Sequence, residues 1–224
     1  MSREENIARF EELFKKITRD GADKLLEFIR KSDFYTAPAS TRFHNAKEGG
    51  LLEHSLNVYE LLSKKLHTEG TLWNDIMKEK KITEENLLII GLLHDICKVN
   101  YYVQDYKNQK TYDKEVVSTY SPQERKRDSK GEYVWETVPV YTVEDQMPYG
   151  HGEKSVMIIE AYMTLKWSEK FAIRWHMGFS TPKEEWNILS DAMRKYPIIM
   201  AIMEADLEAT HILEAEGSPC SRYS

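Results

Sequence analysis

The pattern of hydrophobic and polar positions is organised around one apolar stretch. Residues 87–93 contain no polar side chain, and the stretch ends at His94, Asp95 and Lys98. It is shorter than the roughly 20 residues that cross a bilayer, and its uniform apolarity predicts a helix buried in a protein core. Burial of an imidazole and a carboxylate at the end of such a helix is costly unless something compensates them. A divalent metal ion would compensate both groups, and an ordinary polar cap at the helix end is the alternative.

Apolar residues at helical spacing predict further helices on both sides of this stretch. The expected ranges are about 3–19, from 22 onward, 51–66, 152–165, 168–177, 183–195 and 197–213. Residues 100–148 differ, because β-branched and aromatic residues are frequent there and alternate with polar ones. Two polar segments, 107–110 and 128–131, have the composition of turns. We therefore predict one mostly α-helical domain over residues 1–216 with a small antiparallel β insertion at 100–148, followed by a flexible tail at 217–224.

Composition and charge narrow the class of protein. The formal net charge of −6 over 224 residues makes binding of long nucleic acid unfavourable, although a local basic patch is compatible with it. The two cysteines, Cys97 and Cys220, form no CxxC pair and no disulfide framework. The N-terminal segment is charged and amphipathic and lacks the apolar core of a signal peptide. We therefore expect a cytoplasmic protein without a membrane segment.

Two further polar side chains are expected to face the core. His54 shares a predicted helix face with Val58 and Leu61. Asp206 follows apolar residues on the buried side of the last predicted helix, and carboxylates are rarely buried unless they are paired or bound to metal. A core hydrogen bond for His54 and a salt bridge from Asp206 to Arg174 or Lys98 are the alternatives to metal binding.

Two more histidines are expected at helix ends beside glycines. His151 lies between two glycines at the start of a predicted helix, where free amides favour an anion and the small neighbours leave room for a ligand. His176 ends a predicted helix two residues before Gly178. A turn histidine and a helix-capping histidine are the respective alternatives. His67 and His211 are expected on the surface, and the position of His44 stays open.

In their order and spacing, these residues resemble the HD-domain superfamily of metal-dependent phosphohydrolases, whose pattern is His, then His-Asp, then a distant Asp. Segment 49–54, Gly-Gly-Leu-Leu-Glu-His, resembles the branch that contains YhaM-type exoribonucleases. Segment 91–98 resembles Leu-Leu-His-Asp-Ile-Gly-Lys, with Cys97 where glycine is usual. His151 and His176 resemble two further histidine positions of that branch. The resemblance covers residues 43–98 and 149–211 and implies an HD-type helical bundle.

The resemblance also implies a mechanism. A divalent cation (Mn, Fe, Zn, Co, Ni or Mg) would be held by His54, His94, Asp95 and Asp206. Asp95 would also orient the attacking water or bridge two metals, and Lys98 would stabilise charge in the transition state. His151 and His176 would bind the phosphate, with a second metal as the alternative.

The implied activity is hydrolysis of a phosphate ester in a nucleotide or another small phosphorylated metabolite. The tyrosine-rich insertion would cover the site and stack on a base. A nuclease that acts on short single strands, an HD-fold diiron oxygenase and a non-catalytic nucleotide sensor are the alternatives, because one fold hosts many functions.

Overall fold

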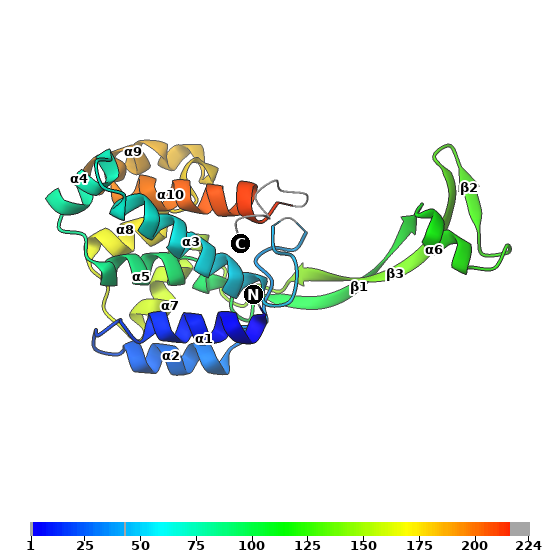
Figure 1. The fold of residues 1–224 in the computed structure, drawn as a ribbon, viewed down its shortest axis with the longest axis horizontal. Helices are drawn as coiled ribbons and strands as arrows, with labels where there is room; N and C mark the ends of the chain where they lie inside the picture. The colour runs from blue at the N-terminus through cyan, green and yellow to red at the C-terminus, as the bar shows by residue number, and fades with distance from the viewer. Residues whose placement is uncertain (1, 43, 216–224) are drawn as a thin grey trace.

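The computed structural model describes residues 2–42 and 44–215. Nine α-helices of this part of the chain form a body (Figure 1), which confirms the predicted mostly α-helical fold. They are α1 (Arg3–Phe14), α2 (Ala22–Lys31), α3 (Gly50–His67), α4 (Leu72–Glu79), α5 (Glu84–Leu93), α7 (His151–Glu160), α8 (Trp167–Trp175), α9 (Trp186–Lys195) and α10 (Ile198–Glu208). Short 3-10 segments η1 (Ile96–Lys98), η2 (Gly178–Ser180) and η3 (Lys183–Glu185) and a π-helical turn η4 (Ala209–Leu213) join or extend them. The tail predicted at 217–224 lies outside the described residues.

Helix α5 is the buried helix that the apolar stretch predicts. It begins with a capping box between Thr83 and Asn86, and every residue from Asn86 to Leu93 is buried. Gly91 lets α3 approach closely, because a Cβ at this position would lie 2.6 Å from the Tyr59 Cα atom. The helix ends at Leu93, earlier than the expected end near Lys98, and a turn at His94 and Asp95 leads into η1.

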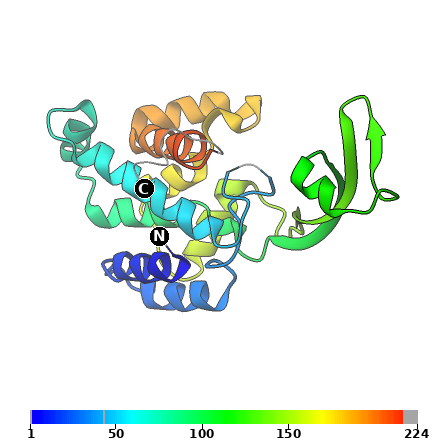
Figure 2. The same ribbon diagram turned by 45° about the vertical axis from the view of Figure 1, so that its right-hand side comes forward.

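The body places α3 and α5 between two groups of helices. Helices α1 and α2 cover one side, and α9 and α10 lie on the other, as both ribbon views show (Figures 1 and 2). The apolar residues between these elements form one large buried cluster that includes Phe10, Leu62, Leu88 and Ile202. Such a cluster fixes the ends of α3, α5, α8 and α10 relative to one another. None of the described helices is long and apolar enough to cross a membrane.

Residues 102–143, here called the arm, project from the body as an extended ribbon (Figures 1 and 2). Strands β1 (Tyr102–Thr111) and β3 (Gly131–Val143) pair antiparallel from Tyr102 opposite Val143 to Thr111 opposite Val134. The short β2 (Lys126–Asp128) pairs with β3, so the sheet order is β1-β3-β2. The predicted antiparallel insertion is confirmed, with an additional helix α6 (Lys114–Thr119) near its far end.

One of the two turns predicted in the insertion is wrong. Residues 107–110 lie inside β1 and pair with residues 135–138 of β3. The polar composition that suggested a turn instead reflects a strand whose side chains are mostly exposed to solvent. The turn predicted at 128–131 is confirmed, since Asp128 pairs with Gly131 and its side chain accepts a hydrogen bond from the Lys130 amide.

Candidate metal centre

The end of α5 directs two side chains into one buried centre. The His94 Nδ1–H group donates to the Gly91 carbonyl over 2.9 Å, so Nε2 faces away from the helix. Asp95 leaves the helical conformation, with φ −106° and ψ 16° in the sparsely populated bridge region. Both side chains are buried. The turn that ends the helix early therefore places an imidazole and a carboxylate side by side in the core.

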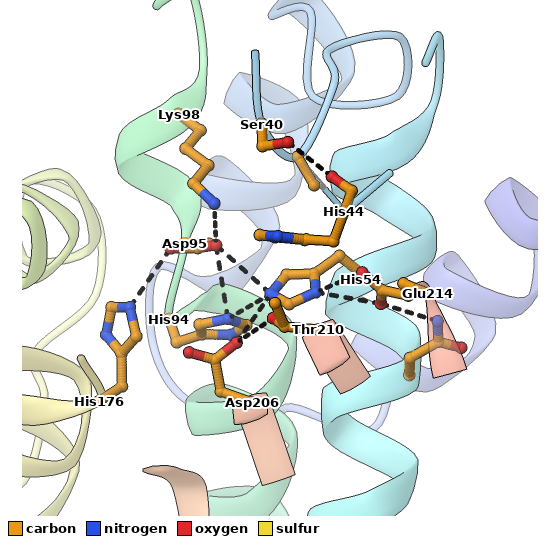
Figure 3. A network of polar contacts seen from close by, with 12 residues as sticks. Ser40, His44, His54, His94, Asp95, Lys98, His176, Asp206, Thr210 and Glu214 are labelled. Atoms are coloured by element: carbon orange, nitrogen blue, oxygen red, sulfur yellow. Dashed lines mark hydrogen bonds and ion pairs between the residues drawn. The ribbon is translucent and has the colours of Figure 1, made fainter. Parts of the chain in front are cut away.

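Helices α3 and α10 bring the other two predicted ligands to the same point (Figure 3). His54 Nε2 lies 3.3 Å from His94 Nε2 and 3.2 Å from Asp206 Oδ1. The Asp95 Oδ2 atom lies 3.5 Å from His54 Nε2 and 3.6 Å from His94 Nε2. The structure thus brings together all four residues that the resemblance assigns to metal binding.

The second carboxylate oxygen of Asp95 faces a second group of side chains. His151, the first residue of α7, places its Nε2 atom 2.6 Å from Asp95 Oδ1. His176 follows the last residue of α8, and its Nε2 atom lies 3.4 Å from the same oxygen. Cys97 Sγ lies 3.4 Å from His151 Nδ1. Asp95 therefore stands between two clusters of donor atoms, with one oxygen directed to each.

The donor atoms fit a cation better than they fit one another. His54 Nε2 faces His94 Nε2 at 3.3 Å, Asp206 Oδ1 at 3.2 Å and Asp95 Oδ2 at 3.5 Å, and a single proton on this nitrogen cannot satisfy all three acceptors. His176 Nε2 is buried, and its 3.4 Å contact with Asp95 Oδ1 does not have the geometry of a hydrogen bond, although buried polar atoms are normally satisfied. Among the described residues, the groups His54–His94–Asp206, His94–Asp95–His176 and Asp95–Cys97–His151 each offer three mutually close ligand atoms. Nitrogen and carboxylate oxygen ligands suit divalent transition metals.

The comparison with protein families agrees with this geometry. A family model described as HD domain matches residues 51–206, a range that contains all four residues His54, His94, Asp95 and Asp206. The chain belongs to the HD domain family. Comparisons with curated proteins and with solved structures gave no match. HD domains bind divalent metals, and the clustered donors of this chain are suited to that role.

In the cluster of predicted metal ligands, a protonated His54 balances the negative charges of Asp206 and Glu214. Burial disfavours a charged imidazole at His54, but hydrogen bonds and ion pairs with Asp206 and Glu214 outweigh burial and raise the pKa of His54 to about 10. Burial and the neighbouring His176 lower the pKa of His94 to about 3. Although burial opposes charge on Asp206, the hydrogen bond from His54 holds the pKa of this carboxyl well below its usual range. A cation that enters the centre would replace the proton of His54 as counter-charge.

Lys98 is the counter-ion of Asp95 in this HD domain. Its Nζ atom lies 2.6 Å from Asp95 Oδ2, and both side chains are buried. Burial alone would disfavour both charges, but their attraction keeps the pKa of Asp95 well below and that of Lys98 above the usual range. The alternative of a salt bridge from Asp206 to Lys98 or Arg174 is wrong: Asp206 contacts His54, while Arg174 pairs with Glu153 and Glu185.

The sequence analysis assigned no role in the centre to three residues that the structure places there. A Glu214 oxygen accepts from His54 Nδ1–H over 3.1 Å, which fixes His54 with Nε2 toward the centre. The His44 ring lies 4.9 Å from that of His54, and Cys97 joins the group of Asp95 and His151. Glu214 lies beyond the last predicted helix and His44 lies in a loop, so neither had a periodic pattern to mark it. The surface positions predicted for His67 and His211 are confirmed.

A cavity of about 680 Å³ opens from the centre to solvent. His54, Asp95, His151, His176 and Asp206 line its floor. Its wall includes Tyr101, Tyr102 and Val143 at the base of the arm, while the arm itself projects outward (Figure 1). The expectation that the insertion covers the site therefore holds only for its base.

Proposed function

We propose that this HD domain is a metal-dependent phosphohydrolase that cleaves phosphate esters of a nucleotide or another small phosphorylated metabolite. The observation that carries the proposal is the position of Asp95 between two clusters of imidazole nitrogens, at 3.5–3.6 Å on one side and 2.6–3.4 Å on the other. A carboxylate in this position can bind a cation with each of its oxygens, and such cations would neutralise the negative charge of a phosphate ester.

The donor clusters on the two sides of Asp95 point to two ions. His54, His94, Asp206 and the Asp95 Oδ2 atom would hold the first ion. His151, His176 and the Asp95 Oδ1 atom would hold the second, and this role is better supported than direct phosphate binding, because Asp95 Oδ1 would repel an anion placed between the histidines. Mn, Fe, Zn, Co, Ni or Mg is compatible with the donor set. When bound, the metal supplies Lewis acidity, which lowers the pKa of a water and neutralises phosphate charge.

The remaining residues orient the reactants. The buried Lys98 faces both Asp95 and the cavity, so its ammonium is placed to stabilise negative charge on a phosphate oxygen. Glu214 and the Gly91 carbonyl hold the rings of His54 and His94 in fixed tautomers. Tyr101 and Tyr102 offer aromatic surface at the cavity wall for a base or sugar. These contacts support a nucleotide as the substrate class, and the segment at 49–54 supports the YhaM-like branch.

Metal analysis of the purified protein, followed by a phosphate-ester screen with Mn, Co, Ni and Mg, tests the proposal. We expect close to two metal ions per chain and phosphate release from at least one nucleotide. His67→Ala is the matched control for His54→Ala, because both histidines lie on α3 and His67 is exposed. Bound metal without phosphate release would overturn the proposal, and oxygen consumption with a polyol in its place would establish the diiron oxygenase alternative.

A further inference from the structure

The register of the arm separates its side chains into two different faces. Residues opposite each other in an antiparallel pair point to the same side of the ribbon, and successive residues alternate. One side therefore carries the even-numbered residues of β1 from Tyr102 to Lys110 and the odd-numbered residues of β3 from Trp135 to Val143. We call this side the aromatic face, because Tyr102, Tyr106, Trp135 and Tyr141 all belong to it.

The two faces also differ in charge. The aromatic face has the amides of Gln104 and Asn108, the hydroxyl of Thr137 and the ammonium of Lys110, but no carboxylate from β1 or β3. Both carboxylates of the paired segment, Asp105 and Glu136, lie on the opposite face. Asp128 also reaches this side, where Lys110 and Tyr112 bind its carboxylate, so among the described residues the aromatic face offers no unpaired carboxylate that would repel a phosphate backbone, although the chain has a net charge of −6.

Aromatic rings line the aromatic face toward both of its ends. Near the body, the rings of Tyr102 and Tyr141 have their centroids 6.5 Å apart. Toward the tip, Trp135 lies 6.1 Å from Tyr133, and the Lys110 Nζ atom lies 4.0 Å above the Tyr133 ring. In the middle and outer parts, Tyr106 is 64% and Trp135 48% exposed, so both offer an open ring surface. The ring of Tyr133 packs on that of Tyr112, which extends the row beyond β1.

Each end of the aromatic face meets a cavity. At the base, Tyr102 and Val143 line the cavity of the metal centre. At the tip, Tyr112 lines a second cavity of about 470 Å³, here called the tip cavity, with Lys114, Arg125, Arg127, Lys130 and Glu132 in its wall. Arg125 donates to the carbonyls of Tyr120 and Ser118. Lys114, Arg127 and Lys130 have no carboxylate partner among the described residues, whereas the nearby Asp128 is bound by Lys110 and Tyr112.

We propose that the aromatic face and the tip cavity bind single-stranded nucleic acid and lead it to the metal centre. Exposed rings stack on successive bases without regard to sequence, and unpaired cations bind the phosphates. Ten residues of β1 span about 33 Å, so a strand of several nucleotides extends from the tip cavity to the base of the arm. The proposal rests on the proposed function and names its substrate class: a short strand whose terminal phosphodiester reaches the metal.

Fluorescence anisotropy with a labelled single strand of about 12 nucleotides, in metal-free protein at physiological salt, tests the binding surface. We expect Trp135→Ala and Tyr106→Ala each to weaken the affinity by about 5- to 150-fold, the range for the loss of one stacked base. Both side chains are largely exposed, so the variants should keep the fold, which circular dichroism checks. Arg127→Ala should weaken binding to all sequences and reduce the salt slope by about one.

Lys107→Ala is the matched control for Arg127→Ala. It removes the same charge from the same face of the arm, because Arg127 pairs with Glu132 and both lie opposite the aromatic face, but Lys107 does not line the tip cavity. Unchanged affinity in this control supports the proposal. A loss equal to that of Arg127→Ala would overturn the proposal, because it would show that any positive charge on the arm attracts the strand equally. Three further results would overturn the proposal. The first two are no binding of the strand by the wild-type protein and equally strong binding of a duplex. The third is a wild-type dimer that dissociates in Trp135→Ala, because the aromatic face would then contact a second copy of the chain.

Turnover of a small phosphodiester separates this proposal from the proposed function. Wild-type protein that hydrolyses bis(p-nitrophenyl) phosphate but binds no strand would refute the binding surface and leave the metal chemistry intact. Protein that binds the strand but hydrolyses neither compound would refute the phosphohydrolase function and leave the surface intact. We expect Trp135→Ala to hydrolyse the small ester at the wild-type rate and the labelled strand more slowly.

Discussion

The body and the arm of this protein are stabilised in different ways. In the body, side chains from α1, α2, α3, α5, α8 and α10 contribute to one large apolar core. In the arm, the buried apolar side chains are Val117, Tyr133 and Val134, and most residues of β1 are exposed. A two-stranded ribbon of this kind depends on its hydrogen bonds and cross-strand pairs. Close packing therefore fixes the positions of atoms in the body. In the arm, the register of the strands decides which side chains share an exposed face.

This difference suits each region to one of the two proposed tasks. Catalysis with metal needs donor atoms held to within fractions of an ångström, which close packing provides for the centre around Asp95. Recognition of a flexible ligand needs exposed and repeated contacts, which an alternating strand provides. The two proposed tasks would meet where Tyr101, Tyr102 and Val143 line the cavity of the metal centre.

The largest effect is expected from removal of ligands in the body. His54→Ala and Asp206→Ala should each lose the metal and reduce turnover more than about 100-fold, because each removes a donor from the first ion. Both variants should remain folded, since the apolar core around them is unchanged. Metal content measured beside a circular dichroism melt checks this, with His67→Ala as control. Full metal occupancy in both variants would remove these residues from the ligand set.

A smaller effect is expected from the histidines beside Asp95 Oδ1. His176→Ala should lower the metal content from two ions to one per chain and reduce kcat by about 10²–10³, because one charge-stabilising group is lost. His151→Ala should act in the same direction. A variant that keeps two ions but loses rate would assign these residues to phosphate binding, and wild-type turnover in both variants would show that they have no role.

The sequence predicted the elements whose apolar residues follow a helical or strand period. The apolar stretch at 87–93 and the spacing in α3 and α10 indicated buried helices, and the polar residues on those faces, His54 and Asp206, indicated a centre. Alternation of aromatic and polar residues indicated the strands of the arm. Each of these signals is local, because helix and strand periods can be read within a window of a dozen residues.

The sequence could not show what depends on long-range contacts. Glu214 is 160 residues from His54 and belongs to no periodic pattern, so only the fold brings the two together. The polar segment at 107–110 resembled a turn because an exposed strand and a turn share the same composition. The position of His151 next to Asp95 likewise follows from the packing of α7 on η1 and from nothing local.

Cys97 brings a sulfur atom to the second donor cluster, beside Asp95 and His151. Nitrogen and sulfur ligands of one tetrahedral ion lie about 3.5 Å apart, from metal distances of roughly 2.1 and 2.3 Å, and Cys97 Sγ lies 3.4–3.6 Å from the His151 nitrogens. We predict that Cys97→Ser lowers the affinity for Zn²⁺ and Co²⁺ by about tenfold and leaves that for Mg²⁺ unchanged, because thiolate prefers softer ions. Loss of the sulfur-to-cobalt absorption band in the variant would confirm the ligand; an identical spectrum would exclude it.

The smallest effect on stability is expected from excision of the arm. Tyr102 pairs with Val143, so their Cα atoms lie about 5 Å apart and a short Gly-Ser link can replace residues 103–142. The link keeps Tyr101, Tyr102 and Val143 in the cavity wall, and the apolar core of the body loses none of its residues. We expect Tm to change by less than about 4 °C, equivalent to about 1 kcal/mol for a chain of this size.

Metal content and turnover of a small phosphodiester should stay at the wild-type level, while selectivity among nucleotides and binding of single strands should be lost. A large fall in Tm would show that the arm stabilises the body. Unchanged selectivity among nucleotides would show that substrate specificity is determined by the body alone.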